Sequence, residues 1–386
     1  MRIALINNFE RTTGIGKYTV ALFKLLNANG IDATLISLNP FDTTGLRGNV
    51  VVLNDGSKTP FNTFKNYFIN PHRIAPDFDL YHITNEQIGI FAKYNKPSVV
   101  TFLDTFLTGP GSEFAAGLGS RPRFFAKKLS WSKPYHYFLN RSRLASCYAD
   151  AIICDSEFTK RNVVANLPRL PREMETIFGL TSDLMPREKG VERRRLNLPM
   201  DANIILTVGG DSNLVKNLPV SLTAFSKVLK SENECFLLIV GRIGYQTKRL
   251  IADLKLETKV IILPHVTEEV LASAYNASDV LLFPVLYAGF GLPVVEAFAS
   301  GCPVVASNAG SIPEIAGNAA CLNDPGDVEG LANSLISVLS NKYFRETLIL
   351  RGLKVVEKYS INEWAKATVR LYERVIYGKA RSIGNI

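Results

Sequence analysis

The sequence predicts an α/β fold with two doubly wound, Rossmann-like domains, and three observations support this prediction. The chain has 386 residues, more than a single hydrophobic core usually organises. Short runs of β-branched residues alternate with amphipathic stretches of helix length, as in parallel βαβ units. These runs form two comparable sets of six, which favours two sheets over one.

The expected strands fall into one set in each half of the chain. The first set is Arg2–Ile6, Ala33–Ser37, Val50–Leu53, Leu80–Ile83, Ser98–Phe102 and Ala151–Cys154. The second set is Ile204–Val208, Phe236–Val240, Val260–Leu263, Val280–Phe283, Pro303–Ala306 and Ala320–Leu322. Between them lie a proline-containing segment and a charged segment, so we expect domains over 1–180 and 181–365. Residues 366–386 are expected to form a helix that returns to the first domain.

The composition excludes several classes of protein. With 47% hydrophobic and 20% charged residues, the chain is globular rather than disordered. The apolar run at the N-terminus is too short for a signal peptide or a membrane span, so we expect a cytoplasmic protein. Five cysteines lack CxxC spacing and lie mostly in or beside apolar runs, which predicts buried thiols, no disulfide and no zinc.

The net charge of +9 arises mostly in residues 1–180. The stretch 121–143 mixes aromatic residues with seven basic residues and no acid: Arg121, Arg123, Lys127, Lys128, Lys133, Arg141 and Arg143. Such a mixture suits an anionic membrane surface and a peripheral location, and we expect no nucleic-acid partner. The alternative is a solvated helix face whose aromatic side chains pack into the core.

The loop after the first expected strand contains Gly14, Ile15 and Gly16 just before a helix. Doubly wound sheets bind ligands at such loops, and the glycines let the backbone approach an anion at the helix N-terminus. The segment lacks the third glycine of a dinucleotide motif and the spacing of a P-loop. An ordinary turn is the open alternative.

The strongest motif follows the strand that ends at Pro284. A turn containing Gly289 and Gly291 opens a helix near Pro293, and a helix start of this kind accepts an anion. Glu296 lies about one turn into the helix, where its carboxylate can accept hydrogen bonds from two adjacent ribose hydroxyls. Taken alone, this glutamate could instead favour the helix dipole.

This segment resembles the donor-binding signature of retaining glycosyltransferase family 4, in which two glutamates eight positions apart flank a G-F-G-L-P turn. The resemblance implies the GT-B architecture, in which two Rossmann-like domains face each other across a cleft. It assigns donor binding to the turn residues Ala288, Gly289, Phe290, Gly291 and Leu292 and to the helix residue Glu296. Glu296 matches the glutamate that holds the ribose. Ala288 stands where the family has a glutamate that contacts the donor sugar.

Other segments resemble the family in order and spacing. Lys216 matches the lysine that neutralises the diphosphate, whereas Gly210 stands in the place of a companion arginine. The run from Val260 resembles the segment whose backbone reads the nucleobase, near His265 and Val266.

In the first half, Val99 to Phe106 resembles the end of a strand that carries a His-Asp pair. Asp104 matches the aspartate and is our candidate for orienting the acceptor, while Leu103 replaces the histidine. Capping of the loop is the alternative role for Asp104.

The resemblance implies a metal-independent hexosyltransferase of glycan biosynthesis. Its donor is a UDP- or GDP-linked sugar, used as a co-substrate without any resident cofactor, and its acceptor is lipid-linked or a glycan. Transfer retains the anomeric configuration. The first domain binds the acceptor and the second binds the nucleotide sugar, with Lys216 and Asp104 as catalytic candidates. Lys216 and the amides of the two glycine loops would stabilise charge on the leaving phosphate.

Three substitutions at expected functional positions, Ala288, Gly210 and Leu103, support a second hypothesis. In it the chain is a catalytically impaired homologue that binds nucleotide or glycan or supports a partner transferase. Alternatively, Ala288 is an engineered change in an active enzyme. A sugar-nucleotide epimerase of the same architecture is a further alternative.

Overall fold

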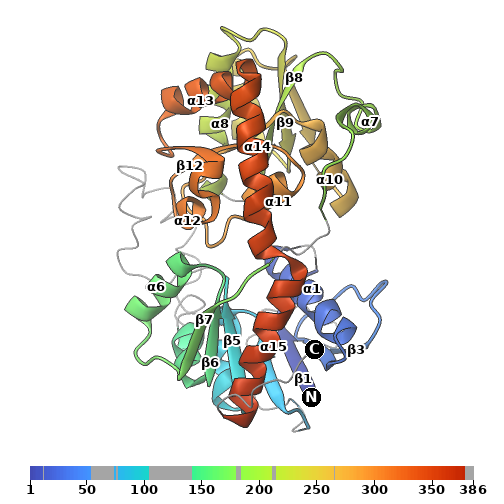
Figure 1. The fold of residues 1–386 in the computed structure, drawn as a ribbon, viewed down its shortest axis with the longest axis vertical. Helices are drawn as coiled ribbons and strands as arrows, with labels where there is room; N and C mark the ends of the chain where they lie inside the picture. The colour runs from blue at the N-terminus through green and yellow to red at the C-terminus, as the bar shows by residue number, and fades with distance from the viewer. Residues whose placement is uncertain are drawn as a thin grey trace. The chain divides into compact units, whose positions relative to one another are not determined.

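A computed structural model of the chain describes residues 1–11, 13–53, 74, 77–103, 141–179, 184–210, 214–264 and 266–378. The chain divides into two compact units, Met1–Ser182 with Ser360–Ile386, and Asp183–Tyr359. Each unit contains one parallel sheet with helices packed around it (Figure 1). The predicted α/β class with two doubly wound sheets is confirmed.

The sheet of the first unit has the strand order β3-β2-β1-β4-β5-β6-β7, and its pairings are parallel. The strands are β1 (Arg2–Asn7), β2 (Asp32–Ser37), β3 (Asn49–Val52), β4 (Leu80–Ile83), β5 (Ser98–Phe102), β6 (Ala151–Cys154) and β7 (Glu173–Thr176). The helical elements are α1 (Gly14–Ala28), η2 (Glu86–Lys93), η4 (Ala145–Tyr148), α6 (Glu157–Asn166) and α15 (Ile361–Tyr377).

Strand β7 was not predicted from the sequence, so the expectation of six strands in the first half was wrong. The strand reads Glu-Met-Glu-Thr, and only Met174 packs against the apolar cluster beside it. It pairs with β6 at the edge of the sheet. On α15, Arg374 forms an ion pair with Glu173, with 3.5 Å between Nε and Oε2, and donates a hydrogen bond to Glu175. Ion pairs with a distant helix therefore replace the apolar run that marks the other strands.

The sheet of the second unit has the order β10-β9-β8-β11-β12-β13. The strands are β8 (Asn203–Val208), β9 (Cys235–Val240), β10 (Val260–Leu263), β11 (Val280–Phe283), β12 (Val304–Ser307) and β13 (Ala320–Asn323). The helical elements are α7 (Lys189–Arg195), η5 (Leu214–Lys216), α8 (Leu218–Val228), α9 (Tyr245–Asp253), α10 (Glu268–Ala277), α11 (Leu292–Ala299), α12 (Ile312–Ala316), η6 (Gly317–Ala319), α13 (Val328–Ser340), α14 (Lys342–Val356) and η7 (Glu357–Tyr359). All six strands predicted here are confirmed.

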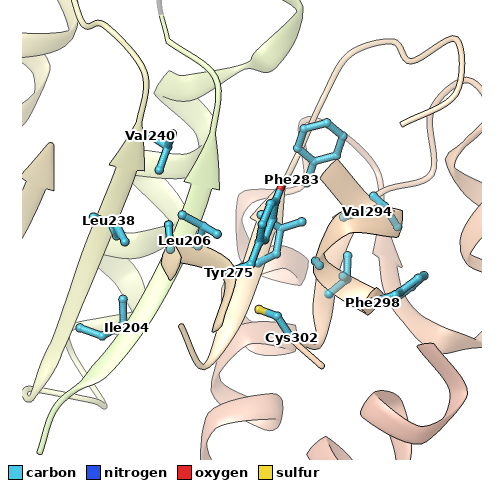
Figure 2. Packing of buried hydrophobic residues seen from close by; sticks show 14 of the residues in the cluster. Ile204, Leu206, Leu238, Val240, Tyr275, Phe283, Val294, Phe298 and Cys302 are labelled. Carbon is cyan, nitrogen blue, oxygen red and sulfur yellow. The ribbon is translucent and has the colours of Figure 1, made fainter. Parts of the chain in front are cut away.

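Both faces of the second sheet are covered by apolar clusters. On β8, Ile204 and Leu206 belong to one cluster, with side chains from α10 and α11, and Ile205 belongs to the other, with α8 and α13. Figure 2 shows the first cluster, in which Tyr275 lies among side chains of the strands and α11. Because successive residues of a strand point to opposite faces, a doubly covered strand is apolar throughout. This explains why the sequence marked these strands so clearly.

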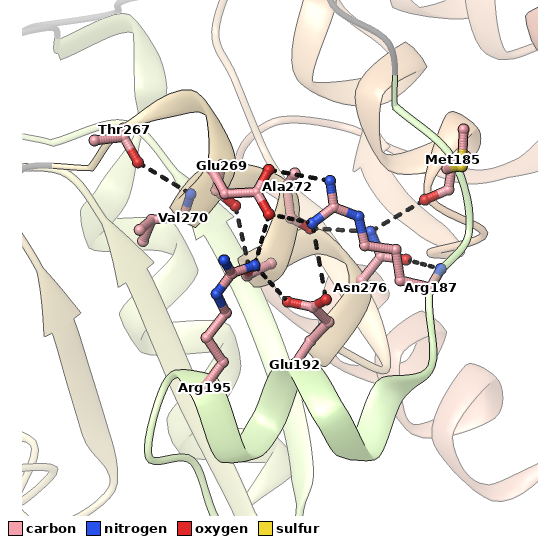
Figure 3. A network of polar contacts seen from close by, with 10 residues as sticks. Met185, Arg187, Glu192, Arg195, Thr267, Glu269, Val270, Ala272 and Asn276 are labelled. Atoms are coloured by element: carbon pink, nitrogen blue, oxygen red, sulfur yellow. Dashed lines mark hydrogen bonds and ion pairs between the residues drawn. The ribbon is translucent and has the colours of Figure 1, made fainter.

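Ion pairs attach helix α7 and the segment just before it to the rest of the second unit (Figure 3). Arg187 donates two hydrogen bonds to Glu269 of α10, at 2.7 and 3.1 Å, and Arg195 donates another at 2.6 Å. Hydrogen bonds from Arg187 and then Arg195 lower the pKa of Glu269 to about 2. Arg193 is buried and donates to Asp279 Oδ2 at 2.6 Å. Exposed pairs such as those of Glu269 contribute little to stability, whereas removing one partner of the buried Arg193–Asp279 pair would leave an unpaired buried charge and be more destabilising.

Candidate functional site

The order of the second sheet reverses between β8 and β11, and ligands bind doubly wound sheets at such a switch point. The loops that follow these two strands are joined directly. Leu286 N–H donates to the carbonyl of Val215 at 2.9 Å, and Asn217 Nδ2 donates to the carbonyl of Pro284 at 2.9 Å. The structure therefore brings together two segments that the sequence analysis assigned separately to the donor.

Lys216 supplies a positive charge at this switch point. Its Nζ lies 4.8 Å from the centroid of the Phe283 ring, at the carboxyl end of β11. Its aliphatic stem passes over Gly209, where an added Cβ would lie 2.7 Å from Lys216 Cγ. Gly209 also has a φ of +122°, so both its backbone conformation and the nearby lysine require glycine there.

Gly210 lies against the loop that follows the neighbouring strand β9. An added Cβ at position 210 would lie 2.0 Å from the carbonyl oxygen of Arg242. The arginine that the family resemblance suggests for this position would not fit unless the backbone moved. Gly210 is close to Lys216 along the chain, but its own contribution to a ligand is limited to backbone groups.

The glycine turn after β11 begins helix α11 as predicted. Gly291 caps the helix with a φ of +94°, and an added Cβ there would lie 2.5 Å from Ile312 Cδ1. Leu292 and Pro293 follow in the first turn, where backbone N–H groups lack partners within the helix and can bind an anion. Phe290 is buried and packs edge-on against Tyr359, with 5.2 Å between the ring centroids.

The loop after β12 holds this turn in place, a feature that sequence analysis missed. Ser311 is fully buried, its N–H donates to the carbonyl of Ala288 at 3.1 Å, and its hydroxyl donates to the carbonyl of Phe290 at 2.7 Å. Gly310 has a φ of +62°, and an added Cβ there would lie 2.3 Å from the Ala288 oxygen. Ala288 itself is half-buried and packs against the apolar cluster. The turn is therefore fixed through its backbone, although position 288 carries no polar side chain.

Glu296 is only 7% exposed, and its carboxylate has a defined partner. The hydroxyl of Tyr275 on α10 donates to Glu296 Oε2 at 2.8 Å. Burying a carboxylate requires compensation of this kind, and the ribose-binding role of Glu296 stays a prediction beside the alternative role at the helix dipole. Tyr275 was missed in the sequence because it occupies an apolar position of its helix.

The predicted nucleobase segment is described only in part. Val266 is half-buried in the loop between β10 and α10 and packs against the same apolar cluster as Ala288. Thr267 caps α10 by accepting a hydrogen bond from Val270 N–H at 3.3 Å. His265 lies outside the described residues, so its role stays a prediction.

In the first unit, Gly14, Ile15 and Gly16 form the first turn of α1, so the expectation that they lie in a loop before the helix was wrong. The amide of Gly16 donates to the side chain of Thr13 at 3.0 Å, and an added Cβ at Gly16 would lie 2.0 Å from the Glu10 carbonyl oxygen. The Gly16 amide is therefore engaged in capping the helix. Anion binding by Gly14 and Ile15 stays a prediction.

Of the two residues at the predicted acceptor position, the structure describes one. Leu103 is half-buried just after β5, and Asp104 lies outside the described residues. His82, a further polar residue of this region, is fully buried, with its ring nitrogens 2.5 Å from the Tyr372 hydroxyl and 2.6 Å from the Thr101 hydroxyl. Burial lowers the pKa of His82 to about 3, so it stays neutral and links α15 to the sheet.

The basic aromatic stretch 121–143 lies outside the described residues except for its last three. Among those, Arg143 is 3% exposed, and its Nη2 lies 3.3 Å from Glu86 Oε1. Arg143 is therefore not part of a basic surface, and our prediction was wrong for this residue because a buried glutamate pairs with it. Among the described residues, no helix has the length and apolar character needed to cross a bilayer. The same residues contain no group of three or more His, Cys, Asp or Glu side chains arranged to hold a metal ion.

Residues 188–355 match the family of glycosyl transferases group 1. This range contains Lys216, the glycine turn and Glu296. In this range the chain is similar to GT4-like glycosyltransferases. Among curated GT4-like relatives, an O-antigen chain mannosyltransferase B from Escherichia coli is 35% identical over 111 residues, which is 29% of each chain. The MMP alpha-(1->4)-mannosyltransferase of Mycolicibacterium hassiacum is 28% identical over 78% of this chain and 71% of its own length.

Solved GT-B structures resemble the chain over almost its whole length. Sucrose-phosphate synthase from Thermosynechococcus elongatus has a TM-score of 0.77 at 21% identity, covering 98% of this chain and 100% of that one. Anabaena HepE in complex with UDP and glucose has a TM-score of 0.73 at 15% identity, covering 96% and 99%. At these identities the structures establish the fold. The matches to the first two curated relatives span 29% and 47% of their lengths, so they do not extend to whole proteins.

Proposed function

We propose that the chain is a glycosyltransferase that moves a hexose from a nucleotide-diphosphate sugar to a lipid-linked or glycan acceptor. The observation that carries the proposal is the grouping of Lys216, the start of α11 and the buried Glu296 around the β8/β11 switch point. A cation and a helix N-terminus suit a diphosphate, and a carboxylate suits the hydroxyls of a ribose. The similarity of residues 188–355 to the glycosyl transferases of group 1 supports the same assignment.

In this proposal the second unit binds the donor and the first unit binds the acceptor. The diphosphate contacts Lys216 and the amides at the start of α11, the ribose contacts Glu296, and the base lies near Val266. When the bond from sugar to phosphate breaks, negative charge grows on the leaving diphosphate, and fixed positive groups lower the barrier. The acceptor oxygen bonds to the anomeric carbon as the bond to phosphate breaks, and the leaving phosphate accepts the acceptor's proton. In this proposal, transfer proceeds without a metal ion and with retention of the anomeric configuration.

The acceptor, the location and the sugar are finer parts of the proposal. Asp104 orients the acceptor, and the basic residues of the stretch 121–143 other than the buried Arg143 hold the protein at an anionic membrane surface on the cytoplasmic side. Two curated relatives are named as mannosyltransferases, so a mannosyl donor should be tested first.

Replacing Glu296 tests the proposed donor site. We expect Glu296→Ala to weaken binding of UDP or GDP by about tenfold or more, because hydrogen bonds to a charged group contribute roughly 1.5–3 kcal/mol. Calorimetric titration of both nucleotides measures the effect. Glu329→Ala, which removes an exposed carboxylate of the same unit, is the matched control. An unchanged dissociation constant in folded Glu296→Ala would return this residue to a purely structural role.

A second candidate function is supported by Ala288, Gly210 and Leu103, which lack the polar side chains expected at their positions. In this case the chain binds a nucleotide or glycan, or supports a partner transferase, without catalysing transfer. Both functions predict nucleotide binding. They differ in whether nucleoside diphosphate is released from a nucleotide sugar when an acceptor is added.

A further inference from the structure

The hydroxyl of Tyr275 is placed where it controls the orientation of Glu296. Tyr275 is fully buried on α10, and its ring lies in the apolar cluster between the strands and α11 (Figure 2). Its hydroxyl donates to Glu296 Oε2 at 2.8 Å. A buried hydroxyl needs a hydrogen-bond partner, and a buried carboxylate needs donors, so each group restricts the other.

This hydrogen bond persists across the physiological pH range. Burial, and then the charge of Glu296, raise the pKa of Tyr275 well above its ordinary value, so the phenol stays protonated and remains a donor. Tyrosine has two side-chain torsions, and here its ring is enclosed by packing on a helix separate from α11. The hydroxyl is therefore a fixed point against which the Glu296 carboxylate is oriented.

We infer that Tyr275 is a positioning residue of the donor site, which acts through Glu296 to select ligands that carry a ribose with both hydroxyls. The inference rests on the proposed function, since it assumes that Glu296 binds the ribose. It adds a specificity-determining residue that does not touch the ligand and that the sequence analysis did not identify.

The test compares Tyr275→Phe with the parent protein in binding UDP and GDP and their 2′,3′-dideoxy analogues. The substitution removes one oxygen atom and keeps the ring in the core. We expect the preference for the ribonucleotide over its dideoxy analogue to fall about tenfold, which is the change for one lost hydrogen bond to a charged group. Affinity for the dideoxy analogue should stay nearly unchanged.

Two controls separate positioning from general loss of stability. Tyr372→Phe removes another fully buried hydroxyl, which contacts His82 in the other unit, and should leave the ribose preference unchanged. The double variant Tyr275→Phe with Glu296→Ala should show the same preference for the ribonucleotide over its dideoxy analogue as Glu296→Ala alone. This is expected because the tyrosine acts through the glutamate.

The outcomes distinguish failure of the inference from failure of the proposed function. If Glu296→Ala keeps the full ribose preference, the proposed function falls and the inference falls with it. If Glu296→Ala loses the preference but Tyr275→Phe keeps it, only the inference is overturned. Additive losses in the double variant also overturn it, because the tyrosine would then act independently of Glu296.

Discussion

Lys216→Ala is expected to lower turnover by about a hundredfold or more, because removing one group that stabilises transition-state charge has an effect of this size. The lysine side chain lies at the carboxyl end of β11, over Phe283 and Gly209. It is half-buried and outside the main apolar clusters, so the melting temperature should change little. Initial rates of nucleoside-diphosphate release, measured with UDP- and GDP-linked sugars on the parent and the variant, give the effect.

The matched control for this substitution is Lys227→Ala, which removes a lysine of the same unit that pairs with the exposed Glu329. Turnover of this control should equal that of the parent. Equal activity of Lys216→Ala and the parent would remove Lys216 from the site. A similar loss of turnover in both variants would point to a general effect of charge.

Ala288→Glu is expected to raise turnover roughly a hundredfold, because the new carboxylate can accept hydrogen bonds from the sugar hydroxyls during transfer. The turn around position 288 is held by Ser311 and Gly310 through backbone groups, so the substitution leaves those contacts in place. Affinity for free UDP or GDP should change little, because Glu296 and Lys216 bind the nucleotide. A gain in turnover without a gain in nucleotide affinity marks an interaction made mainly in the transition state.

Ala288→Gln has nearly the same shape without the charge and is the control for this variant. It should give a much smaller gain. The contrary result for Ala288→Glu is a lower melting temperature with no added activity. That result would show that the pocket has adapted to alanine, since Ala288 packs against the apolar cluster and an unpaired carboxylate there is costly. It would favour the non-catalytic alternative.

The sequence predicted those elements of the fold that a local hydrophobic pattern indicates. Strands covered on both faces, such as β8 and β11, are mostly or wholly apolar and were recognised. Strand β7 was missed because it is stabilised by Met174 and by ion pairs with Arg374, a residue of α15 that is remote along the chain. The sequence around β7 does not indicate contacts with a residue so far along the chain.

In the candidate site, too, the features with a local sequence pattern were predicted and those that depend on long-range contacts were not. Glu296 and the turn before α11 were predicted, because glycine, proline and an acid at fixed spacing indicate a turn and a helix start from the local sequence alone. The contacts of Tyr275 with Glu296 and of Ser311 with the turn depend on which helices and loops meet in three dimensions. The glycine at position 210 also has a long-range cause, since the Arg242 backbone occupies the space that a side chain would need.

The most direct test of the account is calorimetric titration of the full chain with UDP and GDP, each compared with its nucleoside, uridine or guanosine. The central claim is that Lys216, the start of α11 and Glu296 form a site for a nucleoside diphosphate. The account predicts that at least one of the two diphosphates binds, and that its nucleoside binds at least tenfold more weakly because it lacks the charge that Lys216 and the helix start attract. Absence of binding by both diphosphates, or equal affinity for a diphosphate and its nucleoside, would contradict the claim.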